Sequence, residues 1–295
     1  MIPITLRQLE IFAEVARRES LAEAGRVLRL SQPTISEALR DLERNLGQPL
    51  FDRTARRLRL NTAGRAMLAD AGSIVADVQA VVRHHRGREH LTIGASVTVG
   101  NYLLPDLVIA TRRAEPALEI SVVVRNTQAM VQALLQREIE AALVEGRVSH
   151  PELAVRPWRR DIQVIIAAPG HPLVENCNAE AVAAAEWILR EPGSGTREAF
   201  DAWAEALPFT PKVVMTVGGN ELLKRAVAGG EVIGCLSRAA VQAELGRGEL
   251  SLIEPPGAAI ERILSIVLPR RLTPQPALLR FLERCQASAD PELWS

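Results

Sequence analysis

Apolar residues recur at spacings of three and four through most of the first 85 residues, and short apolar runs between polar turns replace this pattern from residue 91 onward. A spacing of three and four is typical of an amphipathic helix. It predicts helices over residues 6–18, from residue 21 to about residue 28, and over residues 31–46. Because the connections between them are short, the three helices predict a helix-turn-helix unit.

The third of these helices has a well-defined beginning. Ser31 can cap it by accepting a hydrogen bond from a free backbone N–H of the first turn, and Pro33 lies where its fixed φ costs nothing. Its apolar stripe is formed by Ile35, Leu39, Leu42 and Leu46, and its opposite face carries Gln32, Thr34, Ser36, Glu37, Arg40 and Arg44. A capped helix with short polar groups in its first turn suits the major groove of DNA. An ordinary amphipathic surface helix is the alternative, because capped helices of that kind are common.

A basic segment follows this helix. Residues 53–65 contain no acidic residue and five arginines, which are Arg53, Arg56, Arg57, Arg59 and Arg65. Leu58 and Leu60 alternate with two of them, which is the period-two pattern of a short β-ribbon. We therefore expect a wing whose apolar side packs on the domain and whose guanidinium side faces phosphates. A solvated basic loop is the alternative.

A long helix is expected from residue 62 to about residue 85. Its face is mostly small and aliphatic, and such a face on an exposed helix usually packs against a partner helix. We expect a homodimer, because a two-fold axis relating two DNA-reading heads matches a palindromic DNA site. His84, His85 and His90 cluster near the end of this helix, but a solvent-exposed cluster is the simpler interpretation, so no metal is expected.

Charge is distributed unevenly along the 295 residues. The formal net charge is zero, but residues 1–90 hold 15 arginines and no lysine against 11 acidic residues, a net of +4. Residues 91–295 therefore carry a net of −4. A basic front and an acidic remainder fit a nucleic-acid-binding domain joined to a domain of another kind.

The spacing of the cysteines and the hydropathy of the chain indicate its cellular compartment. Cys177, Cys235 and Cys285 are too far apart for a disulfide framework or a zinc pattern, so we expect structural thiols, with a redox sensor as the alternative. The first 20 residues lack the apolar core of a signal peptide, and no run is long enough to span a bilayer. We expect a soluble, cytoplasmic protein with no membrane partner.

Apolar runs and helical spacing alternate from residue 91 onward. Strands are expected over residues 91–95, 118–125, 140–146 and 162–169, with helical segments between the first three. The order strand, helix, strand, helix, strand indicates a parallel sheet with crossover helices. A helix within residues 272–287 is expected to close the chain.

The front of the chain resembles the DNA-binding domain of LysR-type transcriptional regulators. The resemblance runs from Leu6 to Gly64 and is carried by LRQLEIFAEVARRESLAEAGRVLRLSQPTIS, ALRDLE, LGQPLFDR and LNTAG, which occur in order at the right spacing. It implies an all-α winged helix-turn-helix domain over residues 1–61, a dimerisation helix and hinge over residues 62–90, and an effector-binding domain over residues 91–295. Many such regulators are tetramers, so a dimer of dimers is also implied.

The same resemblance assigns DNA contacts and divides the rear domain. It places recognition-helix contacts at Ser31, Gln32, Pro33, Thr34, Ser36 and Arg40 and a phosphate contact at Arg53, with Arg56 and Arg57 beside it in the wing. Glu37 lies on the same exposed face and would repel phosphate. The rear domain resembles the α/β type-2 periplasmic-binding-protein fold, with one lobe over residues 91–161 and 268–295 and the other over residues 162–267.

Helix starts in the rear domain supply the candidate ligand site. Ligands in open α/β sheets collect at the carboxyl ends of strands, here between the lobes. Helix starts present free N–H groups and the positive end of a dipole, so a small anion is the expected ligand. The candidate residues are Ser96, Thr98, Val99, Gly100, Asn101, Thr127, Glu145, Gly195, Thr196, Arg197 and Asn220. The alternative is that these are ordinary helix caps without a ligand.

Glu145 is the unexpected member of this set. A carboxylate there would discourage a doubly charged anion unless a proton is shared. The runs LVEG, GNYLLP and REPGSGTREAF resemble the branch of the family that contains sulfite-sensing and sulfur-assimilation regulators. Runs like the last two also occur in regulators of carbon-fixation genes. The resemblance thus implies a small oxyanion such as sulfite.

The expected function is that of a DNA-binding transcriptional regulator controlled by a small effector, with RNA polymerase as a candidate partner. The alternative is a solute-binding protein without a gene-regulatory role, which the rear domain alone would permit and the front domain argues against. Neither an enzyme nor a cofactor is expected, because no nucleophile with a base partner, metal set or phosphate loop appears. The run GSGT lacks the Gly-Lys-Ser/Thr ending of such a loop.

Overall fold

The computed structural model divides the chain into two compact units, Met1–Glu89 with Leu135–Glu138 and His90–Leu134 with Ile139–Ser295. The structure describes residues 3–54, 57–85, 89–175, 177–254, 259–272 and 274–293. Each unit has an apolar core of its own. No helix among the described residues combines the length and apolar character needed to cross a membrane.

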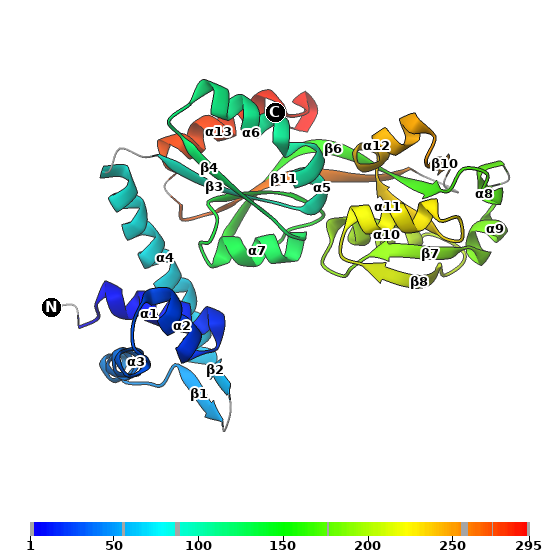
Figure 1. Ribbon diagram of the computed structural model, residues 1–295. Coiled ribbons are helices and arrows are strands. Elements are labelled where there is room, and N and C mark those ends of the chain that lie inside the picture. The colour runs from blue at the N-terminus through cyan, green and yellow to red at the C-terminus, as the bar shows by residue number, and fades with distance from the viewer. Residues whose placement is uncertain are drawn as a thin grey trace. The chain divides into compact units, whose positions relative to one another are not determined.

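The front unit consists of helices with a short two-stranded ribbon at one edge (Figure 1). Its elements are α1 (Leu6–Arg18), α2 (Leu21–Leu28), α3 (Gln32–Leu46), β1 (Phe51–Thr54), β2 (Arg57–Leu60) and α4 (Thr62–His85). The three short helices, the ribbon and the long helix expected from the sequence are therefore confirmed. The rings of Phe12 on α1 and Phe51 on β1 meet edge to face with centroids 5.6 Å apart, and this contact fixes the ribbon on the helical core.

The second unit alternates strands and helices. Its first half contains β3 (His90–Ala95), α5 (Val97–Tyr102), α6 (Leu104–Ala114), β4 (Glu119–Val124), α7 (Thr127–Leu135), β5 (Ala141–Glu145), β6 (Leu153–Ala167), α8 (Pro172–Glu175) and α9 (Ala179–Ala184). Its second half contains β7 (Glu186–Arg190), α10 (Gly195–Ala204), β8 (Lys212–Val217), α11 (Asn220–Ala228), β9 (Ile233–Ser237), α12 (Arg238–Arg247), β10 (Ser251–Ile253), β11 (Ile260–Pro269), α13 (Pro276–Ala287) and a 3₁₀ turn (Pro291–Leu293).

One sheet runs through the whole of this unit. Within the described residues its strand order is β4-β3-β5-β11-β6-β9-β7-β8, with β10 paired to β6. The strands β3, β4 and β5 are mutually parallel, as are β7, β8 and β9, whereas β6 and β11 run antiparallel to their neighbours. Lobe 1 is the part built on β3, β4 and β5 with α13, and lobe 2 is the part built on β7, β8 and β9. Separate apolar clusters fill the two lobes.

The strands β6 and β11 connect the lobes (Figure 1). They pair from Gln163 opposite Ile260 to Leu153 opposite Pro269. The sequence pattern predicted a strand only over residues 162–169, so β6 begins nine residues earlier than expected. Arginines and a proline interrupt the apolar pattern in residues 153–161, and pairing with β11 overrides that weak local signal.

Candidate functional site

The first turn of α3 is a polar surface with a fixed geometry. The Ser31 hydroxyl accepts a hydrogen bond from the Thr34 amide at 3.3 Å and lies 2.7 Å from the Thr34 hydroxyl. Ile35, Leu39 and Leu42 are buried on the opposite side. Of the six recognition-helix candidates, Ser36 is half-buried, and Ser31, Gln32, Pro33, Thr34 and Arg40 are exposed. Five of the six can therefore reach a partner without rearrangement of the helix.

The ribbon that follows has the expected alternation. Its strands pair from Phe51 opposite Leu60 to Thr54 opposite Arg57. Leu58 and Leu60 pack on the core while Arg59 is exposed. The backbone of Arg53 and Arg57 lies in these strands, and Arg56 lies outside the described residues, so phosphate contacts by these three arginines stay predictions.

In lobe 1, three sequence candidates meet at the end of β5. The backbone N–H of Glu145 donates to the Ser96 hydroxyl at 3.2 Å, and its carbonyl accepts a hydrogen bond from the Thr127 hydroxyl at 2.7 Å. Ser96 precedes α5 and Thr127 begins α7, so Glu145 ties together the starts of both helices. All three residues are buried.

In lobe 2, the start of α10 lies against Glu145. Gly195 is the first residue of α10, and a Cβ built on it would lie 2.2 Å from the carbonyl oxygen of Glu145. Only glycine permits this approach. The next residue, Thr196, is 1% exposed, and its amide donates to the Ser194 hydroxyl that caps the helix. The candidates Glu145, Gly195 and Thr196 are thus in one place, although they come from different lobes.

A buried arginine that the sequence analysis missed organises this meeting point. Arg262 on β11 donates from Nε to Asp161 Oδ2 at 2.7 Å and from Nη1 to Thr196 Oγ1 at 3.0 Å. Its Nη2 lies 2.6 Å from Glu145 Oε2 and 2.7 Å from Asp161 Oδ2. Asp161 also accepts a hydrogen bond from the Ser237 hydroxyl, just before α12, at 2.6 Å. One guanidinium therefore contacts two carboxylates and both lobes.

A second buried arginine orients the start of α11. Arg190, at the end of β7, donates from Nη1 to Asn220 Oδ1 at 2.5 Å and from Nε to Glu191 Oε2 at 2.8 Å. The Asn126 amide of lobe 1 donates to Glu191 Oε1 at 3.2 Å, which links the lobes. Burial acts to raise the pKa of the Glu191 carboxyl, but the hydrogen bonds from Arg190 and Asn126 outweigh burial and hold that pKa below its usual value.

Two polar atoms near this second group are buried without a hydrogen-bond partner in the described part of the chain. They are Thr98 Oγ1 on α5 and Asn220 Nδ2 on α11. Tyr102, one helical turn after Thr98, donates its hydroxyl to Glu221 Oε1 at 3.0 Å, and Glu221 adjoins Asn220. This hydrogen bond joins the end of α5 in lobe 1 to the start of α11 in lobe 2, the two helices that carry the unpartnered atoms.

The remaining candidates have other roles in the packing. Val99 belongs to the core of lobe 1, and Asn101 is exposed. Gly100 is explained by packing, since a Cβ there would lie 2.7 Å from the side chain of Val124. Arg197 donates to Asp201 Oδ1 at 2.8 Å and to the Arg190 carbonyl at 3.3 Å, so its charge is already compensated.

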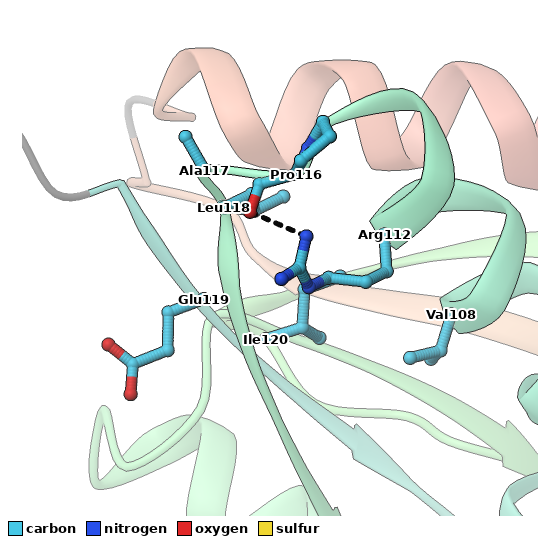
Figure 2. A pocket seen from close by; sticks show the side chains of 7 residues that line it. All are labelled: Val108, Arg112, Pro116, Ala117, Leu118, Glu119 and Ile120. Carbon is cyan, nitrogen blue, oxygen red and sulfur yellow. Dashed lines mark hydrogen bonds between the residues drawn. The ribbon is translucent and has the colours of Figure 1, made fainter.

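Two cavities are relevant to ligand access. An open groove of roughly 1420 Å³ runs between the lobes, and its lining includes Thr127, Gly193, Ser194, Arg197 and Arg262. A smaller pocket of roughly 400 Å³ lies between α6 and β4 in lobe 1. Figure 2 shows Arg112 in that pocket directed at the Pro116 carbonyl, with the Glu119 carboxylate pointing away from it. Thr127 and Arg197 are the effector candidates in the lining of the interlobe groove, whereas Ser96, Thr98, Glu145, Thr196 and Asn220 are not among the residues that line it.

The thiols are poorly suited to redox sensing. Burial raises the pKa of both Cys235 and Cys285 to about 12, and burial also raises the pKa of Cys177. The reactive thiolate is therefore scarce at neutral pH. Within the described residues, no group of three or more histidine, cysteine or acidic side chains is arranged to hold a metal ion.

Two family models match the chain. The model described as "Bacterial regulatory helix-turn-helix protein, lysR family" matches residues 6–65, and the one described as "LysR substrate binding domain" matches residues 84–290. The uncharacterised HTH-type transcriptional regulator YeiE of Escherichia coli K12 is 39% identical over 294 residues, covering 98% of this chain and 99% of that protein. CfxR, an HTH-type transcriptional regulator of Cupriavidus necator, is 32% identical over 282 residues, covering 92% and 88% respectively.

A solved structure has the same fold over nearly its full length. Full-length CbnR in complex with its target DNA matches with a TM-score of 0.66 at 22% sequence identity, covering 97% of this chain and 100% of that one. The combination of a helix-turn-helix unit and a two-lobe α/β unit is therefore shared by both chains.

A substitution that adds one methyl group at Gly195 tests its contact with Glu145. We expect Gly195→Ala to lower the free energy of unfolding of the second unit by about 1–3 kcal/mol, because the added Cβ overlaps backbone that cannot move aside. Urea unfolding followed by tryptophan fluorescence measures this. The control is Gly246→Ala in α12, where a Cβ meets open space and should leave stability unchanged or raise it by up to about 1 kcal/mol. Equal stability of the two variants would show that α10 does not abut Glu145.

Proposed function

The chain belongs to the LysR family of bacterial transcriptional regulators, and on that premise we propose that it is controlled by a small oxyanion bound between the lobes of its second unit. The observation that carries the proposal is a set of buried polar groups at helix starts whose protons have no acceptor among the described residues. These groups are the hydroxyls of Ser96 and Thr196 and the amide of Asn220.

Each of these groups already accepts a hydrogen bond from the protein. The Ser96 hydroxyl accepts one from the Glu145 amide, Thr196 Oγ1 accepts one from Arg262, and Asn220 Oδ1 accepts one from Arg190. A hydroxyl proton and the two protons of the amide Nδ2 remain available for donation. A partner that only accepts hydrogen bonds, such as an oxyanion, suits this arrangement best.

Helix dipoles favour the same ligand. The starts of α7, α10 and α11 are at the carboxyl ends of β4, β7 and β8, and each carries the partial positive charge of a helix N-terminus, although Ala129 and Thr196 donate their amides to the capping residues Asn126 and Ser194. We propose sulfite as the first ligand to test, because the runs around Glu145, Gly100 and Gly195 resemble those of sulfite-sensing regulators. The effector candidates Thr98 and Thr127 complete the proposed site.

The front unit is proposed to read DNA with the first turn of α3 and to grip phosphates with the ribbon. The exposed side chains of Gln32, Thr34 and Arg40 are suited to base edges, and the arginines of residues 53–59 to phosphates. We propose the boundaries 1–61, 62–90 and 91–295 for the reading head, the linker helix and the sensor. RNA polymerase is proposed as a further partner at the promoter.

Assembly is proposed to run through α4. Apolar side chains of its second half are exposed on the single chain, namely Ile74 (43%), Val78 (37%), Val81 (57%) and Val82 (45%). Such a surface is costly to leave in water, and pairing with the same helix of a second copy would bury it. Ligand binding that favours one closure of the lobes would then alter the relation of two paired reading heads.

Sulfite binding can be measured by thermal shift on the full chain. A ligand that binds only the folded state stabilises it, by about 2.7 kcal/mol at a concentration one hundred times its Kd, so the melting temperature should rise with sulfite. Thr196→Val removes the hydroxyl at nearly constant volume and should abolish most of the shift. Thr111→Val, at an equally buried threonine of α6, should leave the shift intact. A wild-type melting temperature that does not change when sulfite is added would contradict the proposal.

Two substitutions separate base reading from phosphate contact. Arg53→Ala should weaken binding to every duplex by a similar factor and reduce the salt slope by about 1, whereas Gln32→Ala should mainly cost discrimination between sequences, about 1–3 kcal/mol at one base pair. Fluorescence anisotropy with the chain's own upstream promoter region and a random duplex, over several salt concentrations, measures both. A loss in Arg53→Ala confined to the promoter would rule out a phosphate role.

The dimer helix can be tested with a charge at its exposed face. Val78→Asp should shift the mass measured by light scattering toward the monomer, because pairing would bury an uncompensated carboxylate. Val174→Asp on α8 is the matched control, since Val174 is exposed to nearly the same extent, 36% against 37%, and should leave the mass unchanged. Retention of the wild-type mass by Val78→Asp would show that the copies do not pair through this face of α4.

A further inference from the structure

The buried cluster between the lobes does not balance its own charge. Arg262 contributes one positive charge, and Glu145 and Asp161 contribute two negative charges. The side chains of Arg262, Glu145 and Asp161 are 3%, 1% and 7% exposed. Since water cannot screen charges at this depth, the excess negative charge acts strongly on anything bound beside it.

Neighbouring ion pairs do not cancel this excess. Arg190 is paired with Glu191, and Arg197 with Asp201. Lys224 on α11 lies 2.7 Å from Glu221 and 2.8 Å from Glu244, so its single charge faces two carboxylates of its own. Arg190, Arg197 and Lys224 therefore each already have at least one anionic partner.

The cluster also lies directly on the groups proposed to hold the ligand. Glu145 receives a hydrogen bond at its carbonyl from Thr127 and donates its N–H to Ser96, while Arg262 donates to Thr196. A ligand held by Ser96 and Thr196 would therefore lie close to the Glu145 carboxylate. Within the described part of the chain, Thr98 Oγ1 and Asn220 Nδ2 are also buried without a hydrogen-bond partner, and they are on helices of the two lobes that a hydrogen bond joins.

We propose that Glu145 is a specificity-determining residue that makes the site select singly charged oxyanions over doubly charged ones. Arg262 is the matching positioning residue, because it holds the carboxylate in place and keeps the Thr196 proton directed to the ligand. This inference rests on the proposed binding of an oxyanion between the lobes. The repulsion from one excess charge doubles when the ligand charge doubles, whereas the hydrogen-bond donors offer the same contacts to both ligands.

Two sulfur oxyanions with fixed charges test the proposal. Methanesulfonate carries one negative charge and sulfate two at neutral pH, and titration calorimetry on the full chain gives both affinities. The wild type should bind methanesulfonate about threefold more tightly than sulfate. Glu145→Gln removes one negative charge, so it should tighten methanesulfonate binding about threefold and sulfate binding about tenfold, in proportion to ligand charge.

The matched control is Glu115→Gln, which makes the same chemical change in the ion pair with Arg280 in lobe 1 and should leave both affinities at wild-type values. A merely structural role for Glu145 would lower both affinities together and leave their ratio unchanged, and that result would overturn the inference. If Glu145→Gln fails to fold, Asp161→Asn removes a charge from the same cluster and should shift the ratio in the same direction.

The outcomes separate this inference from the function on which it rests. Equal binding of the two anions by the wild type, unchanged in Glu145→Gln, would overturn charge selection and leave oxyanion binding intact. Failure of the wild type to bind either anion would overturn both the oxyanion proposal and this inference.

Discussion

A single guanidinium held between two carboxylates fixes the geometry on which the second unit depends. Arg262 lies on one connecting strand and Asp161 directly opposite it on the other, so the ion pair is part of the β6–β11 ladder. Through Glu145 it reaches the starts of α5 and α7, and through Thr196 the start of α10. Removing one partner of a buried pair typically costs about 3–5 kcal/mol, so this junction resists rearrangement.

As a consequence, the protein orients the polar side chains between the lobes before any ligand binds. Arg262, Arg190 and the Glu145 amide occupy acceptor positions of Thr196, Asn220 and Ser96, and in the proposed site the protons of those side chains would bind the ligand. Gly195 lets the lobes approach closely, since any larger residue would strike the Glu145 carbonyl. A ligand bound there would change the lobe equilibrium only by its difference in affinity between the two closures, so the proposed anion would act as a signal only if these donors contact it better in one closure than in the other.

Local signals in the sequence were sufficient for the helices and ribbon of the front unit and for the parallel strands β3, β4 and β5. The cap at Ser31 and the alternation around Leu58 depend on neighbouring residues, and both are confirmed. Arg262, Asp161 and Arg190 could not be found in this way, because their importance arises from strand register and burial. The early start of β6 was missed for the same reason. At Gly100 the packing against Val124 is sufficient to require a glycine, and its proposed ligand contact stays a prediction.

The central claim is that the oxyanion site and the DNA-reading head share one conformational equilibrium. Thermodynamic linkage requires any such coupling to be reciprocal, and typical coupling factors are about 5–150-fold. The most direct test is to measure the Kd of sulfite with and without saturating promoter DNA, and the Kd of the DNA with and without saturating sulfite. The account predicts that both constants change by the same factor, and two constants that do not respond to the other ligand would contradict it.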